Sequence, residues 1–341
     1  MEARTASPAA AAPSGENIIR TLPILVVHAH SACNCRCLMC DIWKIREAKS
    51  FGVRDLRPQL ESIRRLGVRW IVFSGGEPLL NADLPEVCAM LRAEGIHLTL
   101  LSTGLLLKKQ ARSIAASFDD VIVSLDGPRQ IHDQIRRVDG AFDSINEGVA
   151  ALRQLRPGMK IAARSTVQRV NHRFLVETAR AAFRMKLDGI SFLAVDVNST
   201  AFNRSLVWPL ARQNEIALSL DDVPFLDREI DALILAAKAE FPVGFVAESA
   251  EKLRRIARHF RVLLGVARPE SPICNAPWVS AVVEVDGTVR PCFFHPAIGN
   301  LNQETLEEVV NGSVAQDFRK DLEVESNAIC KNCVCSLNYR A

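Results

Sequence analysis

Residues 31–40 read Ser31-Ala32-Cys33-Asn34-Cys35-Arg36-Cys37-Leu38-Met39-Cys40 and come shortly after an apolar, strand-like stretch at 22–28. Cys33, Cys37 and Cys40 have the spacing C-x3-C-x2-C. Three thiolates on one short loop can hold three irons of a 4Fe–4S cube and leave the fourth iron open. A zinc site needs four ligands, usually in two separated pairs. The spacing therefore favours an iron–sulfur centre over zinc.

Three further motifs come at the ends of later strand-like stretches. They read GGEP at 75–78, STG at 102–104 and SLDGP at 124–128. In this order, and together with the cysteine loop, they resemble the radical S-adenosylmethionine (radical SAM) enzymes. That superfamily has GGEP, T-N-G and S-L-D-G at these places, so the middle motif departs from the pattern by losing its Asn.

Strand-like and helical patterns alternate from residue 22 to about residue 195. Repeated β-then-α units predict a parallel sheet with right-handed crossovers. With the resemblance, the expected fold is α/β, a partial (β/α)6 TIM-like barrel followed by a small hairpin-plus-helix cluster domain. All four motifs fall at the carboxyl ends of strands, where parallel barrels carry their chemistry. The expected strands are 22–29, 70–74, 97–102, 120–125, 160–167 and 189–195, and the expected helices are 57–66, 84–94, 108–117, 143–155 and 174–185.

The chain is expected to divide into four segments. Residues 1–20, which begin with a stretch rich in Ala, Pro and Ser, predict a disordered tail. Residues 21–200 are the barrel core, and 201–270 form a helical connection with amphipathic helices at 226–241 and 251–264. Residues 271–341 form the auxiliary cluster domain.

Composition narrows the classes of partner. The formal charge is +3, from 42 basic and 39 acidic residues, which gives no electrostatic case for nucleic acid or an anionic membrane. No apolar run approaches the roughly 20 residues of a membrane span, and no signal peptide is visible. We therefore expect a cytoplasmic protein, in which clustered cysteines indicate metal rather than disulfides.

A second cysteine cluster lies near the C-terminus. Asp286-Gly287 between strand-like segments predicts a hairpin over 281–294. The spacing of Cys274, Gly287 and Cys292 resembles the opening of the SPASM domain, an iron–sulfur module of many radical SAM enzymes. Fewer cysteines follow than in the full module, so the region resembles its shortened "twitch" version with one auxiliary 4Fe–4S cluster. The implied ligands are Cys274, Cys292, Cys330 and Cys333, with Cys335 as an alternative.

Three points stay open among the cysteines. Four thiolates in two pairs also suit structural zinc, although a radical SAM core beside them favours iron–sulfur. Cys35, between the loop ligands, is expected to point away as a bystander. Cys88 lies in a helical pattern and is expected to be a small buried residue.

The resemblance implies roles for the GGEP segment. Gly75 and Gly76 would let the backbone approach the methionine part of S-adenosylmethionine. Glu77, with backbone carbonyls, would accept from its ammonium group, and Pro78 would fix the next turn.

Other cofactor contacts are implied on later strands. Ser124 stands where the family places a polar contact, with Asp126 as second choice, and Thr103 faces cofactor or substrate. Arg164 is either a forked partner for the carboxylate or part of a salt bridge within the barrel. Met39, where an aromatic residue is common, would pack on adenine.

Two polar stretches have open interpretations. Residues 132–137 form either a loop that touches substrate or a solvated helix cap. His295 either shields the auxiliary cluster or is a surface histidine.

The resemblance implies an enzyme that cleaves S-adenosylmethionine with one electron to a 5′-deoxyadenosyl radical. The expected donor is a flavodoxin or ferredoxin. We expect a small-molecule substrate that is oxidised or rearranged with help from the auxiliary 4Fe–4S cluster, because four thiolates leave that cluster no open iron. The alternative is a peptide maturase. A GTP cyclase of molybdenum-cofactor synthesis and a non-enzymatic electron carrier rank lower.

Overall fold

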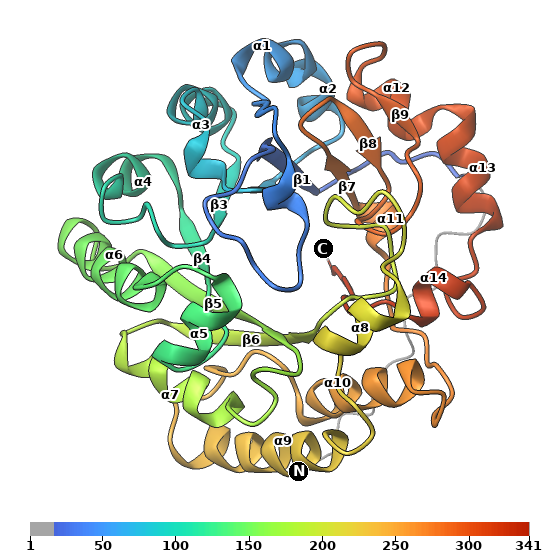
Figure 1. The fold of residues 1–341 in the computed structure, drawn as a ribbon. Helices are drawn as coiled ribbons and strands as arrows, with labels where there is room; N and C mark the ends of the chain where they lie inside the picture. Colours follow the sequence, from blue (N-terminus) through green and yellow to red (C-terminus); the bar gives the residue numbers. More distant parts are fainter. Residues whose placement is uncertain (1–16, 341) are drawn as a thin grey trace, which may run out of the picture.

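The computed structural model describes residues 17–340. Six parallel strands stand side by side in chain order and form a partial barrel (Figure 1). All six predicted strands are confirmed, with ends within two residues of the expected ones. They are β1 (Ile24–His30), β2 (Trp70–Gly75), β3 (His97–Ser102), β4 (Asp120–Ser124), β5 (Lys160–Val167) and β6 (Gly189–Ala194).

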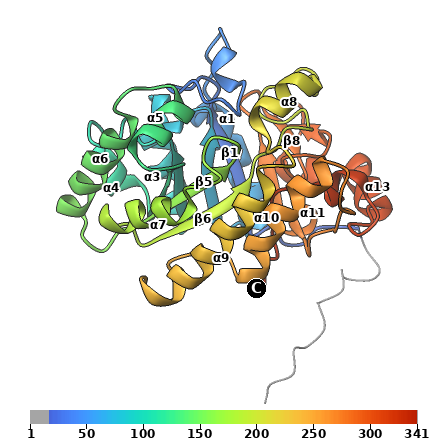
Figure 2. The ribbon, with the colours of Figure 1, turned by 60° about the horizontal axis from the view of Figure 1, so that its bottom comes forward.

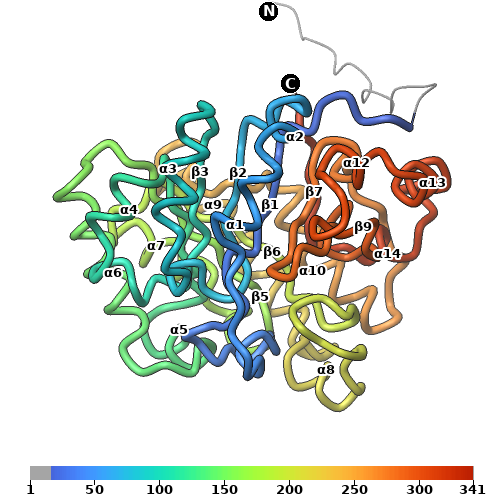
Figure 3. The backbone as a smooth tube through the Cα atoms, turned by 90° about the horizontal axis from the view of Figure 1, so that it is seen from above, coloured from blue at the N-terminus to red at the C-terminus, as the bar shows by residue number. Residues whose placement is uncertain are grey.

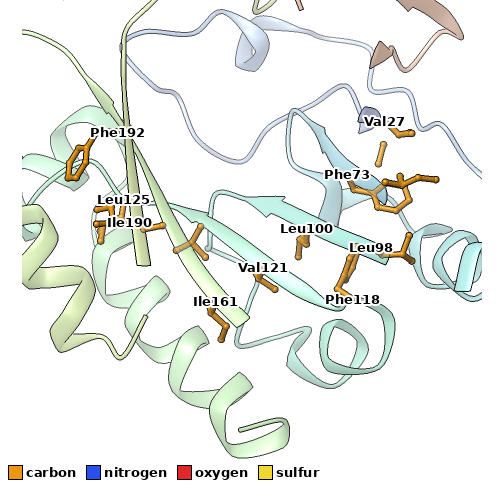
Figure 4. Close-up of a cluster of buried hydrophobic side chains, with 14 of the residues drawn as sticks. Val27, Phe73, Leu98, Leu100, Phe118, Val121, Leu125, Ile161, Ile190 and Phe192 are labelled. Atoms are coloured by element: carbon orange, nitrogen blue, oxygen red, sulfur yellow. The ribbon is translucent and has the colours of Figure 1, made fainter. Parts of the chain in front are cut away.

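Helices cover the outer face of these strands, and Figure 2 shows them along one side of the molecule. Pro58 and Pro85 lie in first turns, where the missing N–H is tolerated. Alternate strand residues point outward and make the main core with the helices, as Leu98, Leu100 and Ile161 show in Figure 4. The helices are η1 (Ile42–Lys44), α1 (Val53–Leu56), η2 (Arg57–Gln59), α2 (Leu60–Arg65), η3 (Pro78–Leu80), α3 (Leu84–Ala93), α4 (Ala111–Ser117), α5 (Arg129–Arg136), α6 (Ala141–Leu155) and α7 (Leu175–Arg184).

The C-terminal region extends the same sheet. Strand β7 (Ser280–Val283) pairs in parallel with β1 along residues 24–27. The predicted hairpin is confirmed: β7 turns at Gly287, whose φ is 83°, into the antiparallel β8 (Thr288–Arg290), and β9 (Gly299–Asn300) follows. The sheet order is β6-β5-β4-β3-β2-β1-β7-β8-β9. The cysteine-rich region is thus joined directly to the strand that precedes the cysteine loop.

The remaining helices all follow β6 in the chain, and Figure 3 shows the C-terminal elements gathered on one side of the barrel. Both amphipathic helices predicted between 226 and 264 are confirmed as α9 and α10. No helix of the described chain is long and apolar enough to cross a membrane. These helices are α8 (Leu210–Ile216), α9 (Val223–Ala239), α10 (Ala250–Leu263), α11 (Ala276–Val279), α12 (Leu306–Asn311), α13 (Ser313–Asp321) and α14 (Ala328–Lys331).

The segment predicted as a disordered tail, 1–20, falls mostly outside the described residues. Its last four residues are held in place. Asn311 exchanges two hydrogen bonds with the backbone of Ile19, at 2.7 and 3.0 Å, and Arg319 donates to the carbonyl of Asn17. Ile19 is buried against the core. Residues 17–20 are therefore part of the fold.

Candidate active site

The cysteine loop leaves the sheet at the carboxyl end of β1. The β1–β2 register shifts between His28 and His30, and the chain then turns away from the strand. The backbone N–H of Cys35 donates to Cys33 Sγ (3.5 Å), and that of Ile42 donates to Cys40 Sγ (3.4 Å). Hydrogen bonds of this kind favour the thiolate form. The loop thus presents sulfur atoms in a setting that suits cluster ligands.

Cys35 does not point away from the predicted ligands. Its thiol is buried and hydrogen-bonds to both Cys33 and Cys37. These bonds raise the pKa of Cys35, and the bond from Cys35 lowers the pKa of Cys37 to about 6. The expectation that the Cys35 side chain points away from the predicted ligands is therefore wrong. The tight loop turns Cys33, Cys35 and Cys37 toward one another.

The two glycines of the GGEP segment allow it to lie directly against the cysteine loop. A Cβ atom on Gly76 would stand 2.1 Å from the carbonyl oxygen of Ala32, and one on Gly75 would stand 2.7 Å from that of His30. Gly75 also has a φ of 117°, which favours glycine. The structure thus requires both glycines for contact between protein segments, a nearer reason than the predicted approach to methionine.

Glu77 is fully buried, and its carboxylate binds groups of the protein itself. Its carboxylate accepts hydrogen bonds from the backbone N–H of Thr103 (2.7 Å) and Leu79 (3.1 Å) and from Ser102 Oγ (2.9 Å). Burial raises its pKa. The prediction that Glu77 accepts from the ammonium of S-adenosylmethionine is not supported, because both oxygens already bind the end of β3. Glu77 positions Thr103.

Thr103 in turn reaches the cysteine loop. Its hydroxyl donates to Asn34 Oδ1 at 2.9 Å, and the side chain is buried. This contact joins the end of β3 to the loop between Cys33 and Cys35. The hydroxyl predicted to meet cofactor or substrate is thus committed to holding the loop, while Pro78 begins the short helix η3 as expected.

Asp126 belongs to a buried ion pair rather than to a ligand surface. One carboxylate oxygen accepts from the backbone N–H of Thr166 (2.8 Å), and the other lies 2.5 Å from Arg136 Nη2. Arg136 Nη1 then donates to Cys37 Sγ at 3.5 Å. Asp126 is completely buried in this network, and its contact with the cofactor stays a prediction. It fixes the arginine that supports a predicted cluster ligand.

The polar stretch 132–137 was expected to be a loop that touches substrate or a solvated helix cap. Neither expectation describes its buried residues. His132 lies on α5, is fully buried, and accepts from the backbone N–H of Asp126 at 3.1 Å. Carbonyl groups of Ile135 and Arg136 accept from the backbone of the cysteine loop, at 3.0 and 3.1 Å. The sequence singled out this stretch, which includes Arg136, but it did not indicate that Arg136 supports Cys37.

Ser124 and Arg164 remain available at the mouth of the barrel. They are register partners on β4 and β5. Alternate residues of β5 are buried in the outer core, so Arg164 faces the barrel interior, where it is exposed and contacts Ser191 Oγ at 3.3 Å. No ion pair involves Arg164 among residues 17–340, so the alternative of a barrel salt bridge is not supported. Its role toward a carboxylate remains a prediction.

Met39 has a defined environment. Its side chain packs against the core, and Gln168 Nε2 contacts its sulfur at 3.5 Å. Its predicted contact with adenine stays a prediction.

The second set of cysteines comes from three distant segments. Cys274 and Cys333 lie near enough to Cys292 and Cys330 for their charges to add to the burial that raises the pKa of both thiols. Asn275 helps to close the site: its side chain donates to the carbonyl of Tyr339 (2.8 Å) and accepts from the N–H of Tyr339 (3.0 Å). The C-terminal segment is thereby tied beside Cys274.

Two further residues touch this set. His295 is buried and its Nε2 lies 3.3 Å from Cys330 Sγ, so it is not a surface histidine. Cys333 Sγ donates to the carbonyl of Cys335 at 2.8 Å, while Cys335 itself is exposed. Cys88 is buried in the core, as predicted.

Both sets offer only thiolates, the donors that iron–sulfur clusters use. Among residues 17–340, no three His, Cys, Asp or Glu side chains are grouped as ligands of a single metal ion. In a 4Fe–4S cube each thiolate binds its own iron, so the fit rests on the donor chemistry of the two sets.

The parallel partial barrel and its cysteine loop define an iron–sulfur protein of the α/β class. Residues 29–202, just over half of the chain, match the model of the radical SAM superfamily, and residues 274–334 match that of the SPASM iron–sulfur cluster-binding domain. The chain belongs to the radical SAM superfamily. Membership implies a catalytic 4Fe–4S cluster and S-adenosylmethionine, and the match to the SPASM domain implies an auxiliary iron–sulfur cluster.

Curated relatives are similar over part of their length. Fe-coproporphyrin III synthase of Methanosarcina barkeri is 29% identical over 44% of this chain and 38% of its own. Pre-heme d1 synthase of Dinoroseobacter shibae is 30% identical over 46% and 39%. A probable GTP 3′,8-cyclase of Methanococcus maripaludis is 33% identical over 34% and 41%. The chain thus spans about two fifths of the length of the curated relatives it matches.

Solved structures share the fold over most of the chain. SuiB of Streptococcus suis, bound to its precursor peptide SuiA, has a TM-score of 0.67 at 15% identity and covers 94% of this chain and 73% of its own. The enzyme anSMEcpe with bound AdoMet has a TM-score of 0.62 at 19% identity, over 86% and 79%. The arrangement of barrel and C-terminal region is therefore shared with these enzymes.

Proposed function

We propose that this chain is a radical SAM oxidoreductase that acts on a small molecule in the mouth of the barrel. One observation carries the proposal. The cysteine loop lies at the carboxyl end of β1, fixed by the ends of β2, β3 and β4, while Arg164, the register partner of Ser124, forms no ion pair within residues 17–340.

In this proposal Cys33, Cys37 and Cys40 hold the catalytic cluster, and Cys274, Cys292, Cys330 and Cys333 hold the auxiliary one. When bound, the first cluster supplies the electron that cleaves S-adenosylmethionine. The side chains of the protein bind and orient the cofactor. Arg164 binds the carboxylate of the cofactor in a fork, Ser124 offers a hydroxyl, and Met39 borders the adenine.

The choice of a small molecule rests on the curated relatives. Two of those named above are synthases of iron-porphyrin or heme compounds, and these match this chain at 29–30% identity. A peptide maturase remains the second candidate, because the fold shared with SuiB includes its C-terminal region. We further infer a cytoplasmic enzyme that takes its electron from a flavodoxin or ferredoxin.

The test is an anaerobic turnover assay on reconstituted protein with dithionite and S-adenosylmethionine. Formation of 5′-deoxyadenosine supports the enzyme class, and its absence contradicts it. Addition of carboxylated porphyrins should then stimulate deoxyadenosine formation and consume the porphyrin. Stimulation by a cysteine- or serine-containing peptide alone would favour the maturase.

The variant Cys330→Ser/Cys333→Ser separates the two clusters. It should lose about half of the iron, as two cubes imply, while still cleaving S-adenosylmethionine slowly without completing the product. This double variant is a better control than truncation near residue 265, because truncation would remove β7 from its pairing with β1. A variant that keeps all of its iron would refute the auxiliary ligand assignment.

A further inference from the structure

The C-terminal turn of α5 is bound to the cysteine loop on both sides of Cys37. The backbone N–H of Arg36 donates to the carbonyl of Arg136 (3.1 Å), and that of Leu38 donates to the carbonyl of Ile135 (3.0 Å). Both carbonyls belong to the last turn of α5, where the helix itself has no N–H group for them. The loop therefore completes the end of α5, and the end of α5 fixes the loop around Cys37.

Arg136 also reaches Cys37 with its side chain. Its Nη1 donates to Cys37 Sγ at 3.5 Å. The sulfur atoms of Cys33 and Cys40 accept instead from the backbone N–H groups of the residues two positions later. In the part of the chain that the structure describes, Cys37 is thus the one predicted catalytic ligand whose sulfur accepts from a charged side chain.

The guanidinium of Arg136 is buried together with its counter-ion. The Arg136 side chain is 8% exposed, and its Nη2 lies 2.5 Å from Oδ2 of the fully buried Asp126. Asp126 is held from β5 and the turn that follows it. Its Oδ1 accepts from the N–H of Thr166, and its carbonyl accepts from Asn171 Nδ2, both at 2.8 Å. The ion pair is therefore fixed in place, with its positive end at Cys37.

One donor of this guanidinium has no acceptor. Arg136 Nε is buried and makes no hydrogen bond within residues 17–340. A buried N–H without a partner carries a free-energy cost, which an acceptor bound beside Cys37 would remove. The sulfide ions of a 4Fe–4S cube are acceptors of this kind. The fit of Arg136 to a cluster thus rests on a contact with a ligand and on an unpaired donor.

We propose that Arg136 is a positioning residue that acts through Cys37 to raise the reduction potential of the catalytic cluster, and that Asp126 limits this effect. Reduction adds one negative charge to the cluster. A fixed positive charge stabilises the reduced form, and an N–H···S hydrogen bond to a ligand acts in the same direction. Arg136 dominates because it touches the ligand, whereas Asp126 reaches the ligand only through Arg136, and Coulomb energy falls with distance.

The consequence is a catalytic cluster that an external one-electron donor reduces more readily. The proposal rests on the assignment of Cys33, Cys37 and Cys40 in the proposed function.

The test is a redox titration followed by electron paramagnetic resonance (EPR) in Cys330→Ser/Cys333→Ser protein, which keeps the catalytic cluster alone. Arg136→Gln should lower the reduced-to-oxidised ratio of this cluster about tenfold at a fixed potential, or about 59 mV for one electron. Asp126→Asn should raise the ratio about threefold, or about 28 mV. A merely structural role of the pair would not give shifts of opposite sign.

Three further variants keep the test decisive. Arg136→Lys keeps the charge and should stay within about threefold of the parent ratio. Arg137→Gln removes the exposed charge of the neighbouring residue, which forms no ion pair in the described chain, and should change the ratio less than about twofold because solvent and salt screen it. If a single variant fails to fold, Asp126→Asn/Arg136→Gln, which leaves no unpaired charge, should still lower the ratio about threefold.

The outcomes that contradict the proposal are distinct. Shifts of the same sign in Arg136→Gln and Asp126→Asn, or shifts below about twofold in both, would overturn it. Loss of the cluster from an Asp126→Asn/Arg136→Gln protein that is folded by circular dichroism would also overturn it, because the pair would then serve cluster assembly. Absence of the cluster from the parent Cys330→Ser/Cys333→Ser protein would instead refute the ligand assignment, and the proposal with it.

Discussion

Around Cys33, Cys37 and Cys40, several elements of the protein contribute buried charges and backbone hydrogen bonds. Around the auxiliary set, the cysteines are positioned mainly by the course of the backbone. Arg136, Arg204, Arg212 and Thr103 all reach the catalytic loop from outside it. The auxiliary cysteines have the Asn275–Tyr339 bonds and the contact from His295. The catalytic loop is thus held in place by contacts from several elements of the protein.

The difference follows from what each site must do. A cluster with an open iron has only three thiolates to fix it, so the surrounding protein must hold the loop and keep a place for a ligand. A cluster with four thiolates from separate segments itself ties those segments together, as structural metals do. The comparison predicts that substitutions of residues that support the catalytic loop have larger effects on activity and stability than substitutions near the auxiliary set.

The largest expected effect comes from removing the catalytic ligands. Cys33→Ala/Cys37→Ala/Cys40→Ala protein should form no 5′-deoxyadenosine, because the open iron is lost, yet it should keep about half of the iron. Chromatography of the assay products and iron analysis provide the measurement. Residual cleavage of S-adenosylmethionine would show that the assignment of this loop is wrong.

Breaking the support of Cys37 should cost stability. Arg136→Met leaves the buried Asp126 without its partner, so the free energy of unfolding should fall by about 3–5 kcal/mol. The neighbouring exposed residue offers a matched control, since Arg137→Met should change it by no more than about 0.5 kcal/mol. Denaturant unfolding of the protein followed by circular dichroism measures both. Equal effects of the two substitutions would remove the special role given to Arg136.

A smaller effect is expected from acid. Burial and the nearby Arg136 lower the pKa of His132 to about 3, against 6.5 when unfolded. Between these values the unfolded chain binds the extra proton, so stability is lost as the pH falls. From pH 7 to pH 5 this residue should cost about 2 kcal/mol.

The variant His132→Asn isolates that contribution. Its side-chain oxygen can still accept from the N–H of Asp126, but it does not titrate in this range. The free energy of unfolding should therefore fall less between pH 7 and pH 5 in the variant than in the parent protein. The same fall in both proteins would assign the acid sensitivity to other groups.

The barrel could be predicted from the sequence because the signals that indicate its strands and helices are local. Apolar runs, first-turn prolines and the Asp286-Gly287 turn each depend on neighbouring residues, and all six strands and the hairpin appear where predicted. The cysteine spacings were visible for the same reason. The hydrogen bonds that Glu77 and Asp126 accept from the protein were not foreseen, because a motif reveals which residue is needed but not what its carboxylate contacts.

Long-range contacts explain what sequence reasoning missed. Arg204 meets Met39 across 165 positions of the chain, and Trp208 meets Asp41 across 167. Neither contact leaves a periodic or compositional signal near the cysteine loop. The pairing of β7 with β1 is equally remote in sequence, so the joining of the C-terminal region to the barrel sheet was also not foreseen.

The central claim is that one cluster has an open iron and the other does not. The most direct test records the EPR signal of each reduced cluster alone, with and without S-adenosylmethionine. In Cys330→Ser/Cys333→Ser protein the signal should change when the ligand binds, because the catalytic iron has a free position. In Cys33→Ala/Cys37→Ala/Cys40→Ala protein it should stay the same. A silent catalytic signal, or an auxiliary signal that responds, would contradict the account.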